Sequence, residues 1–570
     1  MEAARSSPAV LVPPVAADVH QPDPRGGTLA RDLGVTETAA SVLLSRGFVE
    51  KESAARFFDP RLAHLTPPTT MKDREAASSR IARAVRASET IAIFGDYDAD
   101  GVTSAALMTD VLRTLGGHVV TLLADRFEGG YGFSEPALGR VVATGATLLV
   151  TCDCGTSDHP RLESARRRGI DVVVIDHHRV PDEPLPAFAF LNPHRPDCGF
   201  AYKGLASVGL ALSVCAAVRA ELGIALDLRN WLDFVALGTI ADVAPLTGDN
   251  RALVRAGLAL LSKGNRPGTR ALAEITKLVG APLTGEDVSF RLAPRINAPG
   301  RLKKPDLALE LLLCTSPHEA RARAMDLDRI CEERKKLDRA ILAEAEAILT
   351  DPALAALPVV VLGSESWHPG VVGIAAGRLA SKLGKPTIVI GTEGRGSVRG
   401  PAGFPLYSAL SRCKDVLLGF GGHEAAAGVH VALSGVDALR ERFATACVAL
   451  GLGAPSPARP TADAALSPAD EPARVFRDLE LFEPCGHQNP APLLEIACGR
   501  VLGSRIMKER HLALEIQSGR GSLRAFGYDL APQAPAIGSY VRIVGRLRRD
   551  DFRGGGAVEM RMELLQPADS

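Results

Sequence analysis

The stretch TIAIFGDYDADG, residues 90–101, decides the fold of this chain. Its first five residues form a short apolar run typical of a buried strand, and an acidic loop, residues 95–101, follows directly. In open α/β sheets, binding sites form at the carboxyl ends of the strands. An acidic loop in this position therefore predicts a functional crevice in an α/β domain.

Further apolar runs along the chain end in the same kinds of residue. Asp153 follows one run, and the triplet Asp176-His177-His178 follows the next. A fourth acid, Asp242, lies in the stretch LGTIADV. Carboxyl ends of parallel strands meet at one edge of a sheet, so we expect these side chains to converge. Carboxylates with one or two imidazoles suit Mn2+ or Mg2+, and the pattern predicts metal-assisted phosphoester chemistry.

The bulk composition is that of an ordinary multidomain protein. The chain has 570 residues, of which 46% are hydrophobic and 23% charged, enough for roughly three or four domains. Lys+Arg and Asp+Glu both total 66. With no net basic charge, a nucleic-acid partner must be bound by local patches or metal ions. No apolar run is long enough for a membrane span, and the N-terminus does not resemble a signal peptide, so we expect a cytoplasmic protein.

The ten cysteines are scattered, and Cys152 and Cys154 on either side of Asp153 form the one close pair. On a strand, this spacing places both thiols on one face and Asp153 on the other. A zinc site would need partners at CxxC-like spacing, which the chain lacks. Buried free thiols are the favoured interpretation over a zinc site, and they fit a reducing cytoplasm.

Alternating strands and helices predict a mostly parallel α/β sheet, followed by further domains. Strands are expected at residues 118–124, 146–151, 171–175 and 187–191, with helices at 205–222 and 229–237. A polar helix after the Ser-Pro-His-Glu start at 316 is expected to bridge two domains. The expected boundaries are a disordered leader (1–27), N-terminal helices with the catalytic α/β domain (28–315), the connecting helix (316–350), a smaller α/β domain (351–450), a linker (451–470) and a small all-β barrel (471–570).

The barrel is inferred from short β segments near the C-terminus, at residues 510–517, 522–527, 539–548 and 556–565. Few helical stretches interrupt them, which is typical of an OB-like barrel.

Six motifs in a fixed order make the pattern specific: residues 95–101, 176–178, 238–242, 295–301, 367–373 and 421–423. With these motifs and the C-terminal barrel, the chain resembles the DHH phosphoesterase superfamily, and within it the RecJ-type single-strand-specific exonucleases. The resemblance covers about residues 28 to 567.

This resemblance implies a parallel-sheet DHH domain and a smaller DHH-associated α/β domain joined by a long helix, plus a C-terminal OB-fold. It also implies an enzyme of DNA repair and recombination that degrades single-stranded DNA from its 5′ end. Such an enzyme hydrolyses phosphodiester bonds with two Mn2+ or Mg2+ ions and releases 5′-mononucleotides.

The sequence departs from many DHH phosphatases at one position. Those enzymes have a histidine four residues before Asp98, where this chain has Phe94. The RecJ-type pattern tolerates this because Asp96 lies nearby, and we expect a catalytic role for Asp96. Cys152 before Asp153 is a minor variation.

The resemblance implies five metal ligands: Asp98, Asp100, Asp153, His177 and Asp242. Two ions about 3.5–4 Å apart would activate a water, neutralise phosphate charge and stabilise the leaving oxygen. Asp153 is the expected bridging ligand. The alternative is that an Asp-Gly loop is merely a turn. This alternative is reasonable for any one motif taken alone, but not for the whole ordered set of motifs.

Two histidines are implied to act on the phosphate itself. His178 is expected to contact the scissile phosphate or assist proton transfer. His423 is expected to reach the same phosphate from the second α/β domain, where Gly422 lets the backbone approach the substrate. A structural Gly-Gly turn with a core histidine is the alternative for this last motif.

Substrate contacts are expected from Gly-rich turns that carry Arg126, Tyr131, Arg301, Ser397 and Arg399. Arginine binds phosphate through paired donors, and tyrosine stacks on bases. The resemblance implies that Arg126, Ser397 and Arg399 recognise the 5′ end. For any single arginine, a solvated surface position is the alternative.

In the barrel, Arg546 and Arg548 lie in a basic hairpin, with Phe526 and Tyr528 nearby in sequence. Basic grooves with aromatic platforms bind single strands, so we expect these arginines to contact DNA. A solvated hairpin face is the alternative.

Two other functions are compatible with the superfamily. Relatives that hydrolyse short oligonucleotides or cyclic dinucleotides usually lack the long helix and the barrel, and non-catalytic replication scaffolds have lost metal ligands that this chain retains. We therefore expect a monomeric exonuclease that binds single-stranded DNA, with a single-strand-binding protein and a RecQ-type helicase as partners and no membrane association.

Overall fold

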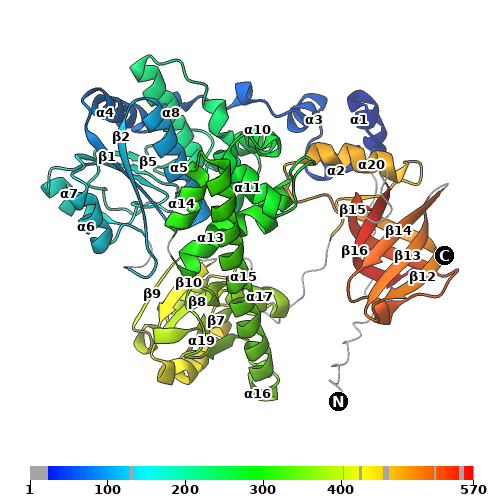
Figure 1. Cartoon of the computed structure of the whole chain (residues 1–570). Coiled ribbons are helices and arrows are strands. Elements are labelled where there is room, and N and C mark those ends of the chain that lie inside the picture. The colour runs from blue at the N-terminus through cyan, green and yellow to red at the C-terminus, as the bar shows by residue number, and fades with distance from the viewer. Residues whose placement is uncertain are drawn as a thin grey trace. The chain divides into compact units, whose positions relative to one another are not determined.

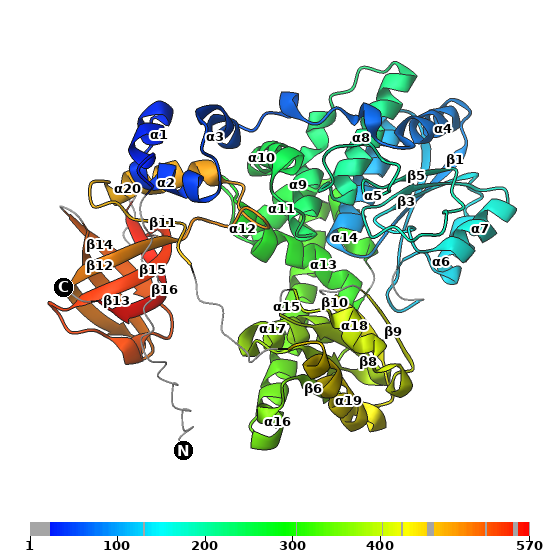
Figure 2. The same cartoon turned by 180° about the vertical axis from the view of Figure 1, so that it is seen from behind.

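The computed structural model describes residues 23–128, 132–303, 305–401, 403–422, 426–452, 461–518, 521–550 and 557–568. Two compact units make up the chain. One unit is Leu62–Ala458, and the other combines Met1–Arg61 with Arg459–Ser570. Figures 1 and 2 show the elements of each unit from opposite sides. Within these described ranges, no helix combines the length and apolar character needed to cross a membrane.

The first sheet of the larger unit is fully parallel, with strand order β2-β1-β3-β4-β5. Its strands are β1 (Thr90–Gly95), β2 (His118–Leu123), β3 (Leu148–Cys152), β4 (Asp171–Ile175) and β5 (Ala189–Leu191). The four strands predicted after β1 are confirmed. The strand order reverses direction at β1 and β3, and in such sheets ligands bind at this switch point.

Helices cover both faces of this sheet. The helices are α4 (Arg74–Arg86), α5 (Ala99–Thr114), α6 (Glu135–Ala143), α7 (His159–Arg167), α8 (Ser207–Leu222) and α9 (Leu232–Ala241). Ile91 and Ile93 face the core shared with α4, α5 and α8, while Ala92 and Phe94 face the core shared with α6 and α7. Burial on both faces explains why the strands read as continuous apolar runs.

Further helices lead from this sheet to the second one. They are α10 (Gly248–Lys263), α11 (Pro267–Ile275), α12 (Gly285–Asp287), a π-helical turn η4 (Val288–Leu292), α13 (Ala293–Leu302), α14 (Asp306–Leu313) and α15 (Pro317–Ile348). The predicted long polar helix is α15, which has 32 residues and begins with the Ser316 side chain accepting the Glu319 N–H. One stripe of α15 is buried, and α15 contacts α11, α13 and α14 as well as α17 (Val372–Leu383). The N-terminal part of this stripe belongs to the core of the first sheet, and its C-terminal part packs in a core with α17. It therefore joins the two α/β parts, as predicted.

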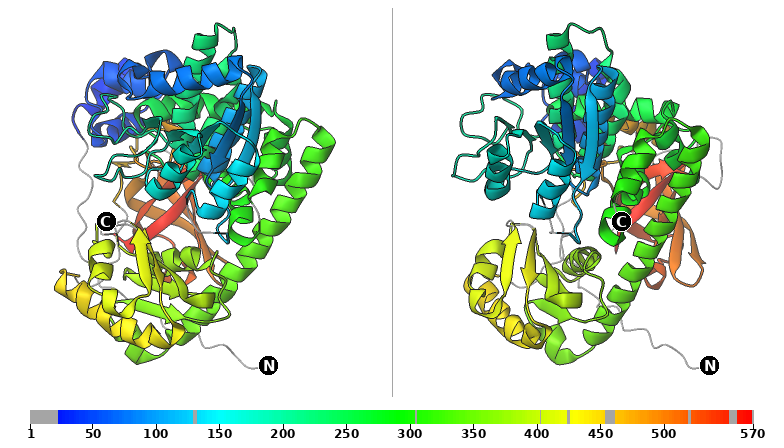
Figure 3. Two further views of the ribbon diagram at one scale, coloured as in Figure 1. Left: turned by 90° about the vertical axis from the view of Figure 1, so that its left-hand side faces the viewer. Right: turned by 60° about the vertical axis from the view of Figure 1, so that its left-hand side comes forward.

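The second sheet is mixed, with strand order β6-β7-β8-β10-β9. Only β6 and β7 run parallel. Its elements besides α17 are α16 (Pro352–Ala356), β6 (Val360–Gly363), β7 (Thr387–Ile390), β8 (Arg395–Arg399), α18 (Leu406–Ser411), β9 (Gly419–Gly422), β10 (Ala426–His430) and α19 (Val436–Ala449). Figure 3 shows this smaller α/β part in yellow-green and yellow at the end of α15.

The smaller unit contains the C-terminal barrel. Its strands are β11 (Ala464–Ala465), β12 (Leu494–Met507), β13 (His511–Ser518), β14 (Gly521–Gly527), β15 (Tyr540–Arg549) and β16 (Val558–Pro567), in the order β11-β12-β13-β14-β16-β15. An additional β12–β15 pairing closes the sheet. The OB-like barrel is confirmed, but β12 was not predicted. Register shifts beside Gly499 and Gly503 interrupt the regular alternation by which a strand is recognised.

The N-terminal helices are placed differently from the expectation that grouped them with the catalytic sheet. Helices α1 (Gly26–Leu33), α2 (Glu37–Ser45) and α3 (Lys51–Phe58) share one core with the barrel and α20 (Pro472–Leu479). The ring of Phe482 lies 5.5 Å from Phe57 and 5.2 Å from Phe58. The apolar faces of these helices thus pack against residues more than 400 positions away in the sequence. A hydrogen bond from the Thr38 N–H to Asp470 likewise spans 432 residues. Local sequence patterns do not reveal such a partner.

The expectation for Cys152 and Cys154 was wrong in one respect. Both thiols are buried and free, but Cys152 faces one core of the sheet and Cys154 the other. The reason is Asp153, whose φ of 64° ends the extended conformation. The alternation of a strand therefore does not continue through this residue.

Candidate active site

The predicted metal ligands converge at the carboxyl ends of the first sheet. Three overlapping groups have ligand atoms within 4.8 Å of one another: Asp96, Asp98 and Asp153; Asp153, His177 and His178; and Asp100, His177 and Asp242. All five predicted ligands belong to these groups. Asp96 and His178, for which catalytic roles were predicted, are also among them. We call these seven residues the ligand cluster.

The acidic loop after β1 is held by its own helix and by a second one. Asp98 caps α5, because its Oδ1 accepts the N–H groups of Asp100 at 3.0 Å and Gly101 at 3.1 Å. The N–H of Ala99 donates to Oδ1 of Asn297 at 2.8 Å. Asn297 lies on α13, in the motif at 295–301, so that motif fixes the loop as well as carrying Arg301.

Asp100 is fixed by the first turn of α8. Its carboxylate accepts the N–H of Ser207 at 2.7 Å and that of Val208 at 3.0 Å. A helix N-terminus favours negative charge, which offsets part of the cost of burying this residue. The hydroxyl of Ser207 also donates to Oδ1 of Asp153 at 3.0 Å. One helix end therefore positions two of the carboxylates.

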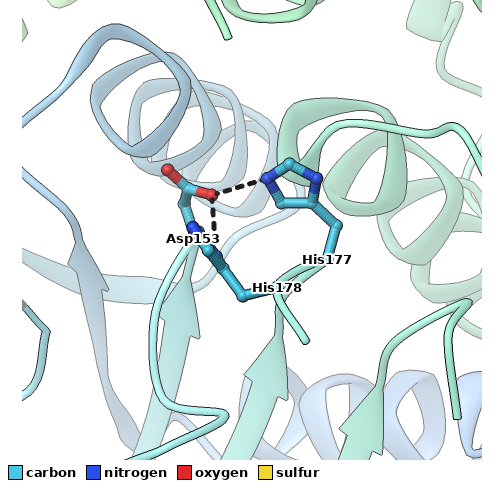
Figure 4. Close-up of side chains that lie close together, drawn as sticks. All are labelled: Asp153, His177 and His178. Carbon is cyan, nitrogen blue, oxygen red and sulfur yellow. Dashed lines mark ion pairs between the residues drawn. The ribbon is translucent and has the colours of Figure 1, made fainter. Parts of the chain in front are cut away.

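Asp153 and the two histidines lie on neighbouring strand ends (Figure 4). Nε2 of His177 is 3.3 Å from Oδ1 of Asp153, and Nδ1 of His178 is 3.9 Å from the same atom. The rings point in different directions, and their planes meet at 63°.

His178 is oriented by Asp176. The imidazole Nδ1 lies 2.7 Å from Oδ1 of Asp176, which also accepts the N–H groups of His177 and His178. Burial opposes a charge on the ring, but the hydrogen bond to Asp176 outweighs it and raises the pKa of His178 to about 9. Burial likewise opposes the charge of Asp176, yet its bond to His178 keeps its pKa below the usual value. The two residues form an ion pair.

Asp242 reaches the cluster from the C-terminal end of α9. Its Oδ2 lies 3.7 Å from Nε2 of His177. Helix α9 approaches α5 closely at Gly238, where a Cβ would collide with the hydroxyl of Thr103 and lie 2.9 Å from Oδ1 of Asp100. The glycine of this motif is therefore required for Asp242 to be near the other acids.

The cluster has more negative charge than its surroundings neutralise. Burial and then the neighbouring Asp98 raise the pKa of Asp100 to about 7. Burial and then Asp100 raise the pKa of Asp242 to about 9, and the same two causes raise that of Asp153. Burial, with the adjacent His178, lowers the pKa of His177 to about 4, so its imidazole is neutral.

The donor set fits divalent cations. Both carboxylate oxygens of Asp96 and the Nε2 atom of His177 are buried, and within the described structure they have no hydrogen-bond partner. Buried polar atoms are costly without partners. Carboxylates that repel one another, together with the neutral imidazole of His177, are the ligands that Mn2+ and Mg2+ accept.

A basic pocket adjoins the Asp96 side of the cluster. The guanidinium of Arg126 lies 4.5 Å from the ring centre of Tyr97, and its Nε has no hydrogen-bond partner among the residues that are described. Burial, reinforced by Arg126, lowers the pKa of Arg301 to about 10 and also lowers that of Arg399. Arg126 thus repels two other partly buried arginines, an arrangement that favours a bound anion.

Ser397 and Arg399 lie on β8 against the first turn of α17. A Cβ on Gly373 would be 3.0 Å from the Ser397 hydroxyl and 3.6 Å from Nη2 of Arg399. A helix N-terminus beside a hydroxyl and a guanidinium is a typical phosphate site. The predicted substrate residues of the second α/β part are therefore brought together with Arg126.

Two predicted residues, Tyr131 and His423, lie outside the described residues. Gly422 is described, and its φ of 135° is unfavourable for other residues. A Cβ at this position would also collide with the backbone of β10.

The barrel arginines are already paired. Arg546 lies 3.2 Å from Glu563, and Arg548 lies 2.6 Å from Glu559. Arg548 also lies above the ring of Phe526, whose ring packs edge-on against Tyr528 at 5.0 Å. Because both arginines are in ion pairs, Phe526 and Tyr528 are stronger candidates for DNA contact than Arg546 and Arg548. Contacts between the two arginines and DNA stay a prediction.

Sequence reasoning gave no individual role to four residues that hold the site: Asp176, Ser207, Asn297 and Asn192. Asp176 and Asn297 lie inside motifs that were recognised, so a search for carboxylate–histidine and capping partners could have found them. Ser207 and Asn192 lie in unremarkable stretches. Asn192 donates to the carbonyl of His178 at 2.7 Å, and only the fold brings the two together.

The sequence matches three known domain families in the same order as the folded parts. It matches the DHH family, N-terminal domain, over residues 90–239; the DHHA1 domain over 356–449; and the RecJ OB domain over 462–563. It is 36% identical to the single-stranded-DNA-specific exonuclease RecJ of Dickeya dadantii over 85% of this chain and 89% of that protein. The chain belongs to the RecJ family.

Other RecJ proteins are similar over most of the chain. The Bacillus subtilis RecJ exonuclease is 33% identical over 94% of this chain and 69% of that protein. The crystal structure of Thermus thermophilus RecJ in complex with Mn2+ matches with a TM-score of 0.82 and 31% identity, over 96% of this chain and 78% of that chain. A second Thermus RecJ structure, in complex with Mg2+, matches with a TM-score of 0.75.

Proposed function

We propose that this RecJ-family protein is a metal-dependent exonuclease that degrades single-stranded DNA from its 5′ end and releases 5′-mononucleotides. The observation that carries the proposal is the juxtaposition of the ligand cluster with a pocket of three arginines in one unit of the chain. The relatives that cover most of the chain are single-stranded-DNA-specific exonucleases, which supports the substrate.

Two Mn2+ or Mg2+ ions are the proposed cofactors. Asp98, Asp100, Asp153, His177 and Asp242 would hold them, with Asp96 close enough to take part. When bound, the ions neutralise phosphate charge and supply an activated water for in-line displacement. The solved RecJ structures in complex with Mn2+ and with Mg2+ support this choice.

The chain's own residues would orient the substrate for hydrolysis. His178, held through Nδ1 by Asp176, would present Nε2 to the scissile phosphate and stabilise its charge in the transition state. Ser207 and the α8 N-terminus hold Asp153 and Asp100 in place, so little reorganisation is needed when substrate binds. His423 is proposed to contact the same phosphate from the second α/β part.

Recognition of the 5′ end is assigned to Arg126, Ser397 and Arg399, with Arg301 beside them. A terminal phosphate carries more charge than an internal one and suits several guanidinium and hydroxyl donors. The residues come from both α/β parts, so an end is bound only where the two parts meet. Gly422 and Tyr131 are proposed to contact the nucleotide.

The barrel is proposed to bind the strand further from the cut, with Phe526 and Tyr528 as stacking platforms and Arg546 and Arg548 near the phosphates. An enzyme that needs an unpaired strand depends on proteins that provide one. We therefore propose that the protein acts as a monomer and that its partners are a RecQ-type helicase and a single-strand-binding protein. Free cysteines support a reducing, cytoplasmic location.

The test uses DNA labelled at one end. The protein should digest a long 5′-phosphorylated single strand with Mn2+, release mononucleotides from the 5′ side and leave a blunt duplex largely intact. Digestion of only very short oligomers would favour the short-oligonucleotide hydrolase of the same superfamily. No digestion of any DNA, with folding confirmed, would favour a scaffold.

A further inference from the structure

A groove lies next to the ligand cluster, and its other lining residues have no role in the proposed function. It has a volume of about 510 Å³ and is lined by residues 179–182, His194 and Pro196, together with His177. His177 is therefore common to the ligand cluster and the groove. A ligand in the groove would lie directly beside the reacting phosphate.

One buried side chain ties together the two loops that form the groove. Asn192, which is 1% exposed, donates from its amide to the carbonyl of His178 at 2.7 Å. Its Oδ1 accepts the N–H of His194 at 2.9 Å. The loop after β4 and the loop after β5 are thereby fixed relative to each other.

The outer ends of both loops are fixed as well. Arg195 donates to Oδ2 of Asp73 and to the carbonyl of Phe190, both at 2.6 Å. On the other loop, Nε2 of His159 lies 3.1 Å from the carbonyl of Glu183. The groove is thus formed before any ligand binds, which lowers the ordering cost of binding.

The groove offers donors for an anion. Arg179 is exposed and makes no ion pair or hydrogen bond with any described residue, and His194 is exposed and lines the same groove. Lys203 is close enough to His194 to act on it electrostatically. Asp182 is the single carboxylate of the lining, while Pro181 and Pro196 add apolar surface. A phosphate attached to a sugar and base matches this combination.

The groove and the arginine pocket adjoin different parts of the ligand cluster. Arg126 covers the ring of Tyr97, which follows Asp96 in the chain, whereas His177 and His194 line the groove together. A strand whose 5′ end lies at Arg126, and whose first linkage lies at the cluster, therefore continues past His177 toward the groove.

We propose that this groove binds the second phosphodiester of the DNA strand, the one on the 3′ side of the scissile linkage, with Arg179 and His194 as its donors. The proposal rests on the proposed exonuclease function and adds a subsite to it. It makes the enzyme sensitive to a charge one linkage beyond the bond that is cut.

The test compares two 5′-phosphorylated DNA trimers in Mn2+ with the full-length protein. One trimer has ordinary linkages, and in the other the second linkage is a neutral methylphosphonate, so the scissile linkage is unchanged. For the wild type, kcat/KM for release of the first nucleotide should be about tenfold or more lower on the neutral trimer, the loss expected for a charged hydrogen bond.

In Arg179→Ala, the ratio between the two trimers should fall toward one, and His194→Gln should reduce it in the same direction. Arg113→Ala is the matched control, because Arg113 is an exposed arginine on α5 that bonds only the carbonyl of Val119 among described residues, and it should keep the wild-type ratio. Arg179→Gln provides a second variant, and thermal unfolding checks that each is folded.

The outcomes separate the two proposals. If the wild type digests long single strands but treats the two trimers alike, the groove proposal is overturned and the exonuclease function stands. The same conclusion follows if Arg179→Ala and His194→Gln keep the wild-type ratio. If the wild type cleaves no DNA, the proposed function fails, and the groove proposal fails with it.

Discussion

Nε2 of His177 and Oδ1 of Asp153 lie 3.3 Å apart, yet no hydrogen bond to a described residue satisfies that nitrogen. Burial, together with His178, lowers the pKa of His177 to about 4, so the ring is neutral at physiological pH. In the tautomer with its proton on Nδ1, the Nε2 lone pair of His177 and the carboxylate oxygen of Asp153 are two electron donors that face each other. A shared cation resolves this arrangement.

Asp153→Asn should lower turnover by at least about 10²-fold, the loss typical of removing a strong stabiliser of transition-state charge. The amide keeps the size of the side chain but removes its charge. Single-turnover cleavage of a labelled single strand at saturating Mn2+ measures the effect. Ser207→Ala removes only a donor to Asp153 and should cost less. Near-normal turnover of a folded Asp153→Asn protein would refute its role as a shared ligand.

Asn297→Ala should weaken metal binding more than it slows catalysis at saturating metal. Asn297 holds the N–H of Ala99 in the loop that bears Asp98 and Asp100. Partners that fix a metal site from outside typically affect its affinity about 10–100-fold. The measurement is activity as a function of Mn2+ concentration. Asn297→Asp keeps the acceptor oxygen and should be closer to wild type; equal metal dependence in all three proteins would exclude this role.

The metal-free protein should lose stability as pH rises, and metal should reverse the loss. The pKa of Asp100 is raised to about 7 and that of Asp242 to about 9, from an ordinary value of 3.8. Between the ordinary and raised values the folded protein binds more protons than the unfolded chain, so each group lowers the free energy of unfolding by up to about 1.4 kcal/mol per pH unit.

Denaturation of EDTA-treated protein between pH 5 and 9 tests this. The midpoint should fall across that range without metal and fall less with Mn2+, because metal binding favours the deprotonated carboxylates. Asp242→Asn cannot lose a proton and should flatten the slope above about pH 7. A midpoint that rises with pH in the metal-free protein would contradict the raised pKa values.

The sequence predicted the parts of the site that lie at strand ends. Asp98, Asp153 and His177 each follow an apolar run, and the parallel sheet necessarily brings such ends to one edge. The residues that position them were missed because they come from other elements. Ser207 reaches Asp153 and Asn297 reaches Ala99 only once α8 and α13 pack against the sheet.

The same distinction explains the errors in the fold. The left-handed conformation of Asp153 places Cys152 and Cys154 in different cores, and no sequence period encodes that change. The N-terminal helices have clear apolar faces, but a face does not specify its partner. Their partner is the barrel, through contacts such as Phe57 with Phe482.

Arg399→Ala should remove most of the preference for a 5′-phosphate. Arg399 lies with Ser397 against the first turn of α17, and Arg126 acts on it from the other α/β part. Loss of a charged hydrogen bond costs about 1.5–3 kcal/mol, or roughly 10–150-fold in kcat/KM. The measurement compares one strand with 5′-phosphate and with 5′-hydroxyl. Arg395→Ala, on the exposed part of the same strand, should retain the preference; an unchanged preference in Arg399→Ala would reject the assignment.

Removing the barrel alone should make the protein aggregate. Removing the barrel together with the N-terminal helices should not. Helices α1 to α3 bury Leu43, Phe57 and Phe58 against the barrel unit. A chain ending at residue 458 would expose this apolar surface, which promotes aggregation. A chain of residues 62–458 lacks those helices and contains the whole ligand cluster.

The shorter chain should therefore be monodisperse and should still cleave short oligonucleotides, because those reach the ligand cluster without the barrel. Its apparent KM for long single strands should rise, and the salt dependence of binding should flatten by about one unit of slope for each lost phosphate contact. Size-exclusion chromatography and cleavage of matched short and long strands by both truncated chains provide the comparison. If residues 62–458 aggregate while residues 1–458 do not, the N-terminal helices belong with the catalytic part after all. If the folded 62–458 chain loses short and long substrates equally, the barrel unit contributes to catalysis and not only to binding.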